Sequence, residues 1–157
     1  MKTAVLFYSL DGNSAFIAEE IKTRLNADIF RVYTKDEKKR SKAGNIFWGG
    51  CMVFFGKKPP LKPLAFDPSA YDLIIIGAPV WADTPATPIK TFISSAGITG
   101  KKIALFVCHE GGMKKTLGKF KKLLPCNEII AEIDFKNTLK NIDETKKKIE
   151  EWVLNLK

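Results

Sequence analysis

Cysteine is scarce in this sequence, and its spacing fits neither a metal site nor a redox motif. Cys51, Cys108 and Cys126 are odd in number, and no two of them form a Cys-x-x-Cys pair. This pattern favours reduced thiols. We therefore expect no metal ligands among the cysteines.

The sequence also lacks a hydrophobic run long enough to span a membrane. Its longest later apolar stretch, residues 46–55, is interrupted by Gly49 and Gly50 and falls short of the roughly 20 residues of a spanning helix. The apolar run over residues 3–8 is too short for a secretory signal and ends before Asp11. We expect a cytoplasmic protein without a membrane span.

Low-complexity segments and internal repeats are absent as well. The chain has 157 residues, of which 45% are hydrophobic. This length is enough for one domain with a core of two or three layers. We predict a single domain over residues 1–157.

Acidic residues are in the minority, and the formal net charge is +9. In the two later lysine clusters, residues 114–122 and 146–148, the lysines alternate with apolar positions at helical spacing. That pattern is typical of solvated helix faces. No basic motif interleaved with aromatic residues accompanies the charge, so nucleic acid is not a predicted partner. An acidic protein partner, or no partner, fits better.

Strand-like and helix-like segments alternate along the chain. Strands are expected at residues 3–9, 28–33, 73–77, 102–108 and 128–135. Five strands separated by helical segments predict an α/β fold with a doubly wound parallel sheet, order 2-1-3-4-5, and helices on both faces. Residues 34–70 are expected to be irregular, with residues 46–55 packed on the sheet in place of a regular second crossover helix.

A loop of small polar residues joins the first strand to the first helix: Ser9, Leu10, Asp11, Gly12, Asn13 and Ser14. Gly12 permits a tight turn, and the free N–H groups at the start of the helix face the same point. These features predict a phosphate site without a positive side chain. The loop has neither a Walker lysine nor three spaced glycines. An ordinary turn with Asn or Ser as the helix cap is the alternative.

Two further loops are expected at the same edge of the sheet, where doubly wound folds bind ligands. One carries Trp81 between prolines, and an exposed indole favours a flat partner. The other, residues 109–112, has two glycines that let the backbone approach a ligand. A phosphate loop, an aromatic wall and a glycine-rich wall together describe a site for an aromatic mononucleotide. FMN fits this description.

Three segments resemble the flavodoxin family: the phosphate loop, residues 71–92 (YDLIIIGAPVWADTPATPIKTF) and residues 101–112 (KKIALFVCHEGG). The resemblance implies a flavodoxin-like fold and non-covalent FMN that performs the redox chemistry. It places the phosphate against Ser9, Asp11, Gly12, Asn13 and Ser14. It places one side of the flavin ring against Pro79, Val80, Trp81 and Ala82, and the other against Cys108, His109, Glu110, Gly111 and Gly112.

The sequence departs from the family pattern at Asp11, which stands where Thr is usual and brings a carboxylate near the phosphate. The basic charge is a second departure, because familiar electron-carrier flavodoxins tend to be acidic. Two functions therefore stay open. The first is an FMN-dependent redox protein, serving a redox partner protein, possibly acidic, or reducing a small acceptor such as a quinone with NAD(P)H. The second is a flavodoxin-fold binding or regulatory module without a cofactor.

We assign no catalytic residue from the sequence. His109, the single histidine, is interpreted as a positioning residue near the ring, and Cys108 as a packing residue at a strand end. Phe47, Trp48 and Phe54 offer an alternative use of residues 46–55, as a lip over the flavin or a partner surface. Either a monomer or a homodimer is compatible with the sequence.

Overall fold

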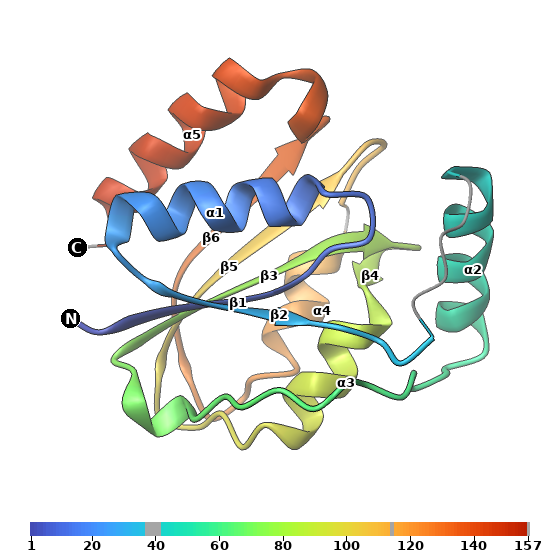
Figure 1. Cartoon of the computed structure of the whole chain (residues 1–157), viewed down its shortest axis with the longest axis horizontal. Coiled ribbons are helices and arrows are strands. Elements are labelled where there is room, and N and C mark those ends of the chain that lie inside the picture. Colours follow the sequence, from blue (N-terminus) through green and yellow to red (C-terminus); the bar gives the residue numbers. More distant parts are fainter. Residues whose placement is uncertain (37–41, 114, 157) are drawn as a thin grey trace.

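A computed structural model describes residues 1–36, 42–113 and 115–156 (Figure 1). Its centre is a sheet in the order β2-β1-β3-β5-β6, with every neighbouring pair parallel. The five strands are β1 (Thr3–Tyr8), β2 (Asp28–Val32), β3 (Leu73–Trp81), β5 (Lys102–His109) and β6 (Glu128–Lys136). A short extra strand, β4 (Thr84–Pro85), pairs antiparallel with the end of β3. The predicted α/β fold and strand order are confirmed, with β5 and β6 as the fourth and fifth expected strands.

Helices cover both faces of the sheet (Figure 1). One face carries α1 (Asn13–Leu25) and α5 (Ile142–Leu154), and the other carries α3 (Thr87–Ser95) and α4 (Thr116–Lys121). Two short 3-10 turns, η1 (Pro68–Ala70) and η2 (Thr138–Lys140), precede β3 and α5. The start of β1 and the end of α5 lie near each other at the amino edge of the central strands (Figure 1).

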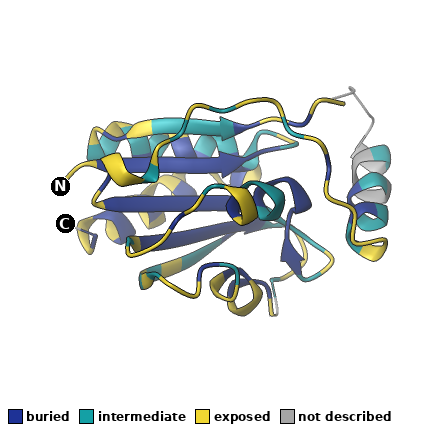
Figure 2. Cartoon of the chain, turned by 90° about the horizontal axis from the view of Figure 1, so that it is seen from below, coloured by how far each residue is buried: buried dark blue, intermediate teal, exposed yellow. Residues whose placement is uncertain are grey.

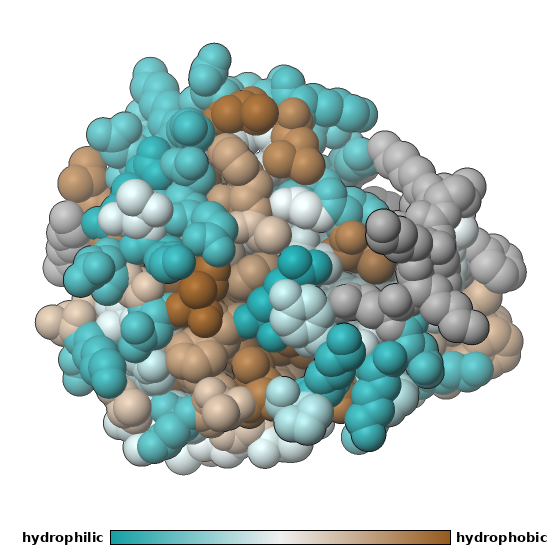
Figure 3. Space-filling view, viewed as in Figure 1, coloured by the Kyte–Doolittle hydropathy of each residue, from teal (hydrophilic) through white to brown (hydrophobic). Residues whose placement is uncertain are grey.

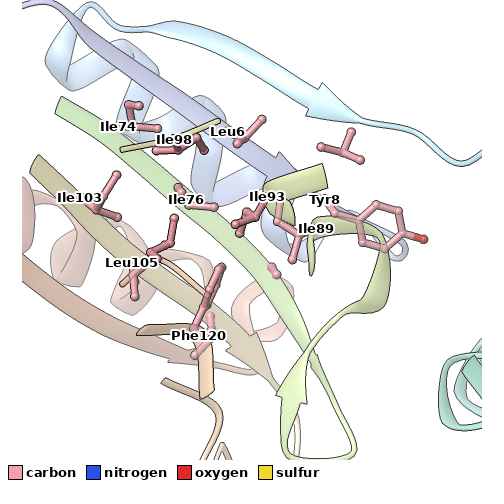
Figure 4. Packing of buried hydrophobic residues seen from close by; sticks show 14 of the residues in the cluster. Leu6, Tyr8, Ile74, Ile76, Ile89, Ile93, Ile98, Ile103, Leu105 and Phe120 are labelled. Carbon is pink, nitrogen blue, oxygen red and sulfur yellow. The ribbon is translucent and has the colours of Figure 1, made fainter. Parts of the chain in front are cut away.

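The central strands are buried on both faces, which explains their continuous apolar sequences. Figure 2 shows them in dark blue between half-exposed helices. On the α3 and α4 face, the sheet residues Leu6, Ile76 and Leu105 pack with Ile89 and Phe120 from the helices (Figure 4). The opposite cluster joins Ile75 and Phe106 of the sheet to α1 and α5.

Gly77 lies at a point of close packing inside the sheet. It is aligned with Phe106 on the neighbouring strand β5. A Cβ atom added at Gly77 would lie 1.9 Å from Cζ of that ring. The Phe106 ring therefore occupies the space that any other side chain at this position would need.

The expectation that residues 34–70 are irregular is wrong for residues 42–54, which form helix α2 (Lys42–Phe54). This helix stands beyond the carboxyl edge of the strands and does not lie on the sheet (Figure 1). Two adjacent glycines within it cost only about 1 kcal/mol each. Gly49 also has a packing role, because a Cβ there would lie 3.0 Å from the Trp81 ring.

An extended segment covers the sheet where residues 46–55 were expected. Leu61, Leu64 and Phe66 pack against the core on the α3 face. The basic stretch before α2 lies mostly outside the described residues, as does the side chain of Phe47. None of the helices in the described part of the chain has the length and hydropathy to traverse a bilayer.

Candidate functional site

A cleft of about 670 Å³ opens at the carboxyl edge of the sheet, where the loops after β1, β3 and β5 meet. All but three of the predicted site residues line it. The exceptions are Ser9, Gly12 and Ser14, of which Ser9 and Ser14 are buried. Leu10, Gly50 and Asp83 also line the cleft and were not predicted as site residues. The full lining consists of Leu10, Asp11, Asn13, Gly50, Pro79, Val80, Trp81, Ala82, Asp83, Cys108, His109, Glu110, Gly111 and Gly112.

The first loop turns at Gly12, as predicted, with a φ of +87°. Gly12 itself is the N-cap of α1, with no side-chain cap, so the Asn or Ser cap of the alternative interpretation is not formed. The first intrahelical hydrogen bond runs from the Phe16 N–H to the Gly12 carbonyl oxygen at 2.9 Å. Amide groups ahead of that bond have no partner within the helix, and the positive end of the helix dipole lies with them.

Long-range hydrogen bonds fix this loop. An Arg31 guanidinium N–H donates to the Ser9 carbonyl oxygen at 3.0 Å, and the Ala15 N–H donates to Ser9 Oγ at 3.2 Å. The Leu139 N–H donates to Asn13 Oδ1 at 3.3 Å. The start of α1 is therefore held from both sides before any ligand arrives. Asp11 lies exposed at the rim of the cleft.

Ser14 and Cys108 join the first loop to the end of β5. Both are buried, and Ser14 Oγ lies 2.8 Å from Cys108 Sγ. Burial raises the pKa of the Cys108 thiol to about 12, and the hydrogen bond with Ser14 opposes this only in part. The thiol therefore stays protonated at neutral pH, which agrees with a packing role.

Cys108 should be nearly inert to thiol reagents in the folded protein. A pKa near 12 instead of 9 reduces the thiolate fraction roughly a thousandfold at pH 8. Mass spectrometry after brief treatment with a disulfide reagent should find the exposed Cys126 modified and Cys108 intact until urea is added. Because the unfolded chain loses the thiol proton near pH 9 and the folded chain near 12, the free energy of unfolding should fall as pH rises between these values. Equal labelling of both thiols in the native protein would contradict this assignment.

The second loop is a tight hairpin that ends β3. Trp81 pairs with Thr84, and the two residues between them, Ala82 and Asp83, have φ values of +47° and +56°. Two positive φ values in a two-residue loop are the geometry of a type I′ turn. This turn holds the indole of Trp81 at the cleft, edge-on to Tyr8 at 5.7 Å and to Trp48 at 5.4 Å between ring centroids.

Ala82→Gly should stabilise the protein by roughly 1 kcal/mol, because a left-handed backbone strains alanine and leaves glycine unstrained. Urea unfolding followed by circular dichroism gives the change. The matched control is Ala96→Gly, at a helix C-cap with a φ of −82°, which should leave stability unchanged or lower it. If both substitutions lower stability alike, the hairpin is not strained at Ala82.

His109 is held at the cleft by a carboxylate behind it. Its Nε2 lies 3.0 Å from Asp134 Oδ2, and Lys148 Nζ lies 3.8 Å from the other carboxylate oxygen. Burial raises the pKa of Asp134, but the hydrogen bond with His109 and the charge of Lys148 outweigh it, and the net pKa is lowered. An ionised Asp134 accepts a hydrogen bond from the N–H at Nε2, and in the neutral imidazole Nδ1 is then a hydrogen-bond acceptor.

His109 Nδ1 is buried and has no hydrogen-bond partner among the described residues. Buried polar atoms normally have partners, so Nδ1 is an orphaned polar atom in a residue that lines the cleft. Asp134 and Lys148 were not predicted as site residues. Their distance from His109 in the sequence offered no signal for this arrangement.

The solved structures that are similar to this chain include the following three. A flavoprotein in complex with FMN from Lactobacillus acidophilus NCFM has a TM-score of 0.74 at 24% identity, covering 88% of this chain and 96% of that one. A protein from Bacteroides eggerthii DSM 20697 has a TM-score of 0.78 at 21% identity, covering 97% and 95%. Oxidised flavodoxin 2 from Bacillus cereus has a TM-score of 0.62 at 17% identity, covering 99% and 97%. At these identities the likeness concerns the fold.

None of the curated proteins compared matches the chain. A family model does. The model described as flavodoxin matches residues 2–156, nearly the whole sequence. It covers all three loops that meet at the cleft, including the turn at Gly12, the Trp81 hairpin and the segment after β5. The chain belongs to the flavodoxin family.

Proposed function

We propose that this protein binds FMN non-covalently in the cleft and serves as a redox protein. The observation that carries the proposal is the cleft itself. It joins the open N-terminus of α1 to the Trp81 hairpin and to the buried, unpaired Nδ1 of His109. The phosphate-binding helix N-terminus suits one end of a mononucleotide. The aromatic wall and the unpaired ring nitrogen suit its other end, the flat ring.

The phosphate end of the cleft has the donors that a phosphate monoester needs. The amides at the start of α1, with Asn13 at the lining, would hold the phosphate, and the helix dipole favours its charge. Arg31 and Leu139 already fix this loop, so little ordering would be required on binding. The exposed carboxylate of Asp11 weakens the site without closing it.

The other end of the cleft fits a flat ring. Trp81 would form one wall, and the 109–112 loop the other. A Cβ added at Gly111 or Gly112 would meet nothing within 4 Å, so the backbone there leaves space beside the cleft. His109 Nδ1 would accept a hydrogen bond from a ring N–H. When bound, FMN supplies the redox chemistry, and the chain orients the ring and shields it from water.

The test is a titration of the apoprotein with FMN, FAD and riboflavin, followed by quenching of flavin fluorescence. We expect one FMN per chain and weaker binding of FAD, because the α1 site accommodates one terminal phosphate. Flavin extracted from the purified protein should be FMN. Failure of the apoprotein to bind micromolar FMN would overturn the proposal and favour a cofactor-free binding module.

The charge of the chain supports an acidic protein as redox partner. With a formal charge of +9, reduction by an acidic ferredoxin-type protein should slow severalfold or more when ionic strength rises from about 0.01 to 0.15 M. Stopped-flow spectroscopy of the flavin would measure this rate. A rate insensitive to salt would show that the basic surface does not select the partner.

Reduction of a small acceptor with NAD(P)H is the second route, and the position of Gly50 favours it. The cleft extends past the three loops to this residue on α2, which leaves room beside the ring for a small molecule such as a quinone. Oxidation of NADH or NADPH, followed at fixed FMN with and without quinone, separates this route from transfer between proteins. The three free thiols support a reducing compartment, and we place the protein in the cytoplasm.

A further inference from the structure

The end of α2 presents two phenylalanine rings to solvent. Phe54 is 85% exposed and Phe55 is 65% exposed, and their rings meet edge to face with centroids 5.2 Å apart. The next three residues, Gly56, Lys57 and Lys58, are exposed too. We name residues 54–58 the α2 tip. At the right margin of Figure 3, hydrophobic atoms of this region lie beside hydrophilic side chains.

The α2 tip has a defined backbone. Gly56 has a φ of +58°, its N–H donates to the Val53 carbonyl oxygen at 3.1 Å, and the Lys57 N–H donates to that of Met52 at 3.0 Å. These two bonds with a left-handed glycine form a Schellman motif, a regular end of a helix. The rings are therefore held outward by an ordered helix end, and their exposure is a property of the fold.

The charged residues in the chain segment that contains the tip have one sign. Residues 42–66 contain four lysines and no acidic residue. Lys57 Nζ lies 5.8 Å from the centroid of the Phe55 ring, within the range of a cation–π contact. Aromatic rings next to lysines suit the surface of a bilayer. The rings enter the boundary between headgroups and acyl chains, and the lysines contact the phosphates of the lipid headgroups.

We propose that the α2 tip docks the protein on membranes that contain anionic phospholipid. The size of the apolar surface favours a bilayer over a second copy of the chain. The two rings, which are 85% and 65% exposed, offer roughly 225–375 Å², whereas a stable protein interface buries about 500 Å² or more on each partner. A bilayer needs no matching surface, and insertion of two rings with nearby lysines suffices for reversible binding.

Docking would bring the cleft close to the bilayer. Gly50, which lines the cleft, precedes Phe54 by four residues, or about 6 Å along the helix. An apolar acceptor dissolved in the membrane would then meet the cleft where the docked protein touches the lipid. This consequence rests on the proposed function, whereas the docking itself does not require FMN.

The experiment is sedimentation of the FMN-treated protein with phosphatidylcholine vesicles, with and without phosphatidylserine. We expect binding that needs phosphatidylserine and falls with salt. Phe54→Ser with Phe55→Ser should weaken it about a hundredfold, near tenfold for each ring. Lys57→Gln with Lys58→Gln should weaken it roughly tenfold or more.

The control variants make changes of the same kind at other exposed positions. Leu154→Ser removes a 62% exposed apolar side chain on α5, and Lys119→Gln with Lys122→Gln removes two exposed lysines near α4. Both should bind vesicles as the unmodified protein does. The proposal would be overturned if the unmodified protein did not bind vesicles, or if the variant with both Phe54 and Phe55 replaced bound them as well as the unmodified protein does.

The two proposals can fail separately. FMN titration of the tip variants checks that they fold, and it should give unchanged affinity because neither ring lines the cleft. Vesicle binding without FMN binding would leave docking intact and overturn the function. If the ring variant loses affinity for an acidic redox protein while vesicle binding stays the same, the tip is a protein-docking surface and the membrane proposal is wrong.

Discussion

Replacing Gly77 with alanine should lower the free energy of unfolding by about 3 kcal/mol. A Cβ atom at 1.9 Å from Cζ of Phe106 is far inside contact distance, so the ring must leave its place. That ring is fully buried and packs edge to face on Phe135, with centroids 6.5 Å apart. Overpacking of this kind commonly costs about 1–3 kcal/mol and sometimes more. We expect the upper part of that range because the neighbouring strand leaves the ring no free space.

Chemical unfolding of Gly77→Ala gives the loss of stability, and Phe106→Leu in the same chain should recover part of it by removing the clash. The matched control is Gly118→Ala in α4, where a Cβ meets nothing within 4 Å. This control should gain roughly 0.5–1 kcal/mol from helix propensity. A Gly77→Ala protein as stable as the original would show that Phe106 can move cheaply.

Asn13→Glu should weaken FMN binding roughly a hundredfold or more without harming the fold. Asn13 is the first residue of α1 and lines the cleft. A carboxylate there faces the phosphate, and two like charges about 4 Å apart repel by ~4 kcal/mol at an effective dielectric constant near 20. The same carboxylate suits the helix N-terminus, so stability should stay level or rise slightly.

Riboflavin distinguishes repulsion of the phosphate from disruption of the whole site, because it has the ring and the ribityl arm but no phosphate. Its affinity should be the same in the Asn13→Glu variant and in the original protein. Asn13→Gln serves as the uncharged control and should keep FMN affinity within severalfold. Asp11→Asn should strengthen FMN binding modestly, because it removes the carboxylate at the rim of the cleft. An equal loss of affinity for FMN and for riboflavin would show that the phosphate does not bind next to Asn13.

The architecture could be predicted because its signals are local. Buried parallel strands are continuous apolar runs, and the turn at Gly12 requires a residue that tolerates positive φ. The strand order alone then predicts that the three loops meet, because the carboxyl ends of parallel strands lie at one edge of the sheet. Hence most of the cleft lining could be named from the sequence.

The features that could not be predicted depend on contacts between segments that are distant in the sequence. The Gly49-Gly50 pair suggested a break, but packing against Trp81 stabilises the helix there. The partners of His109 come from β6 and α5, and no spacing announces them. The positive φ values at Ala82 and Asp83 were hidden too, because alanine is a poor indicator of a type I′ turn.

The placement of the chain ends has a practical consequence for handling the protein. β1 begins and α5 ends at the edge of the molecule opposite α2 (Figure 1), whereas the cleft lies at the carboxyl ends of the strands and reaches Gly50 of α2. A fluorophore, an affinity tag or an electrode linker attached at either end would therefore point away from the ligand. Immobilised through that edge, the molecule would present its cleft outward in a uniform orientation, suited to voltammetry and to binding assays on a surface.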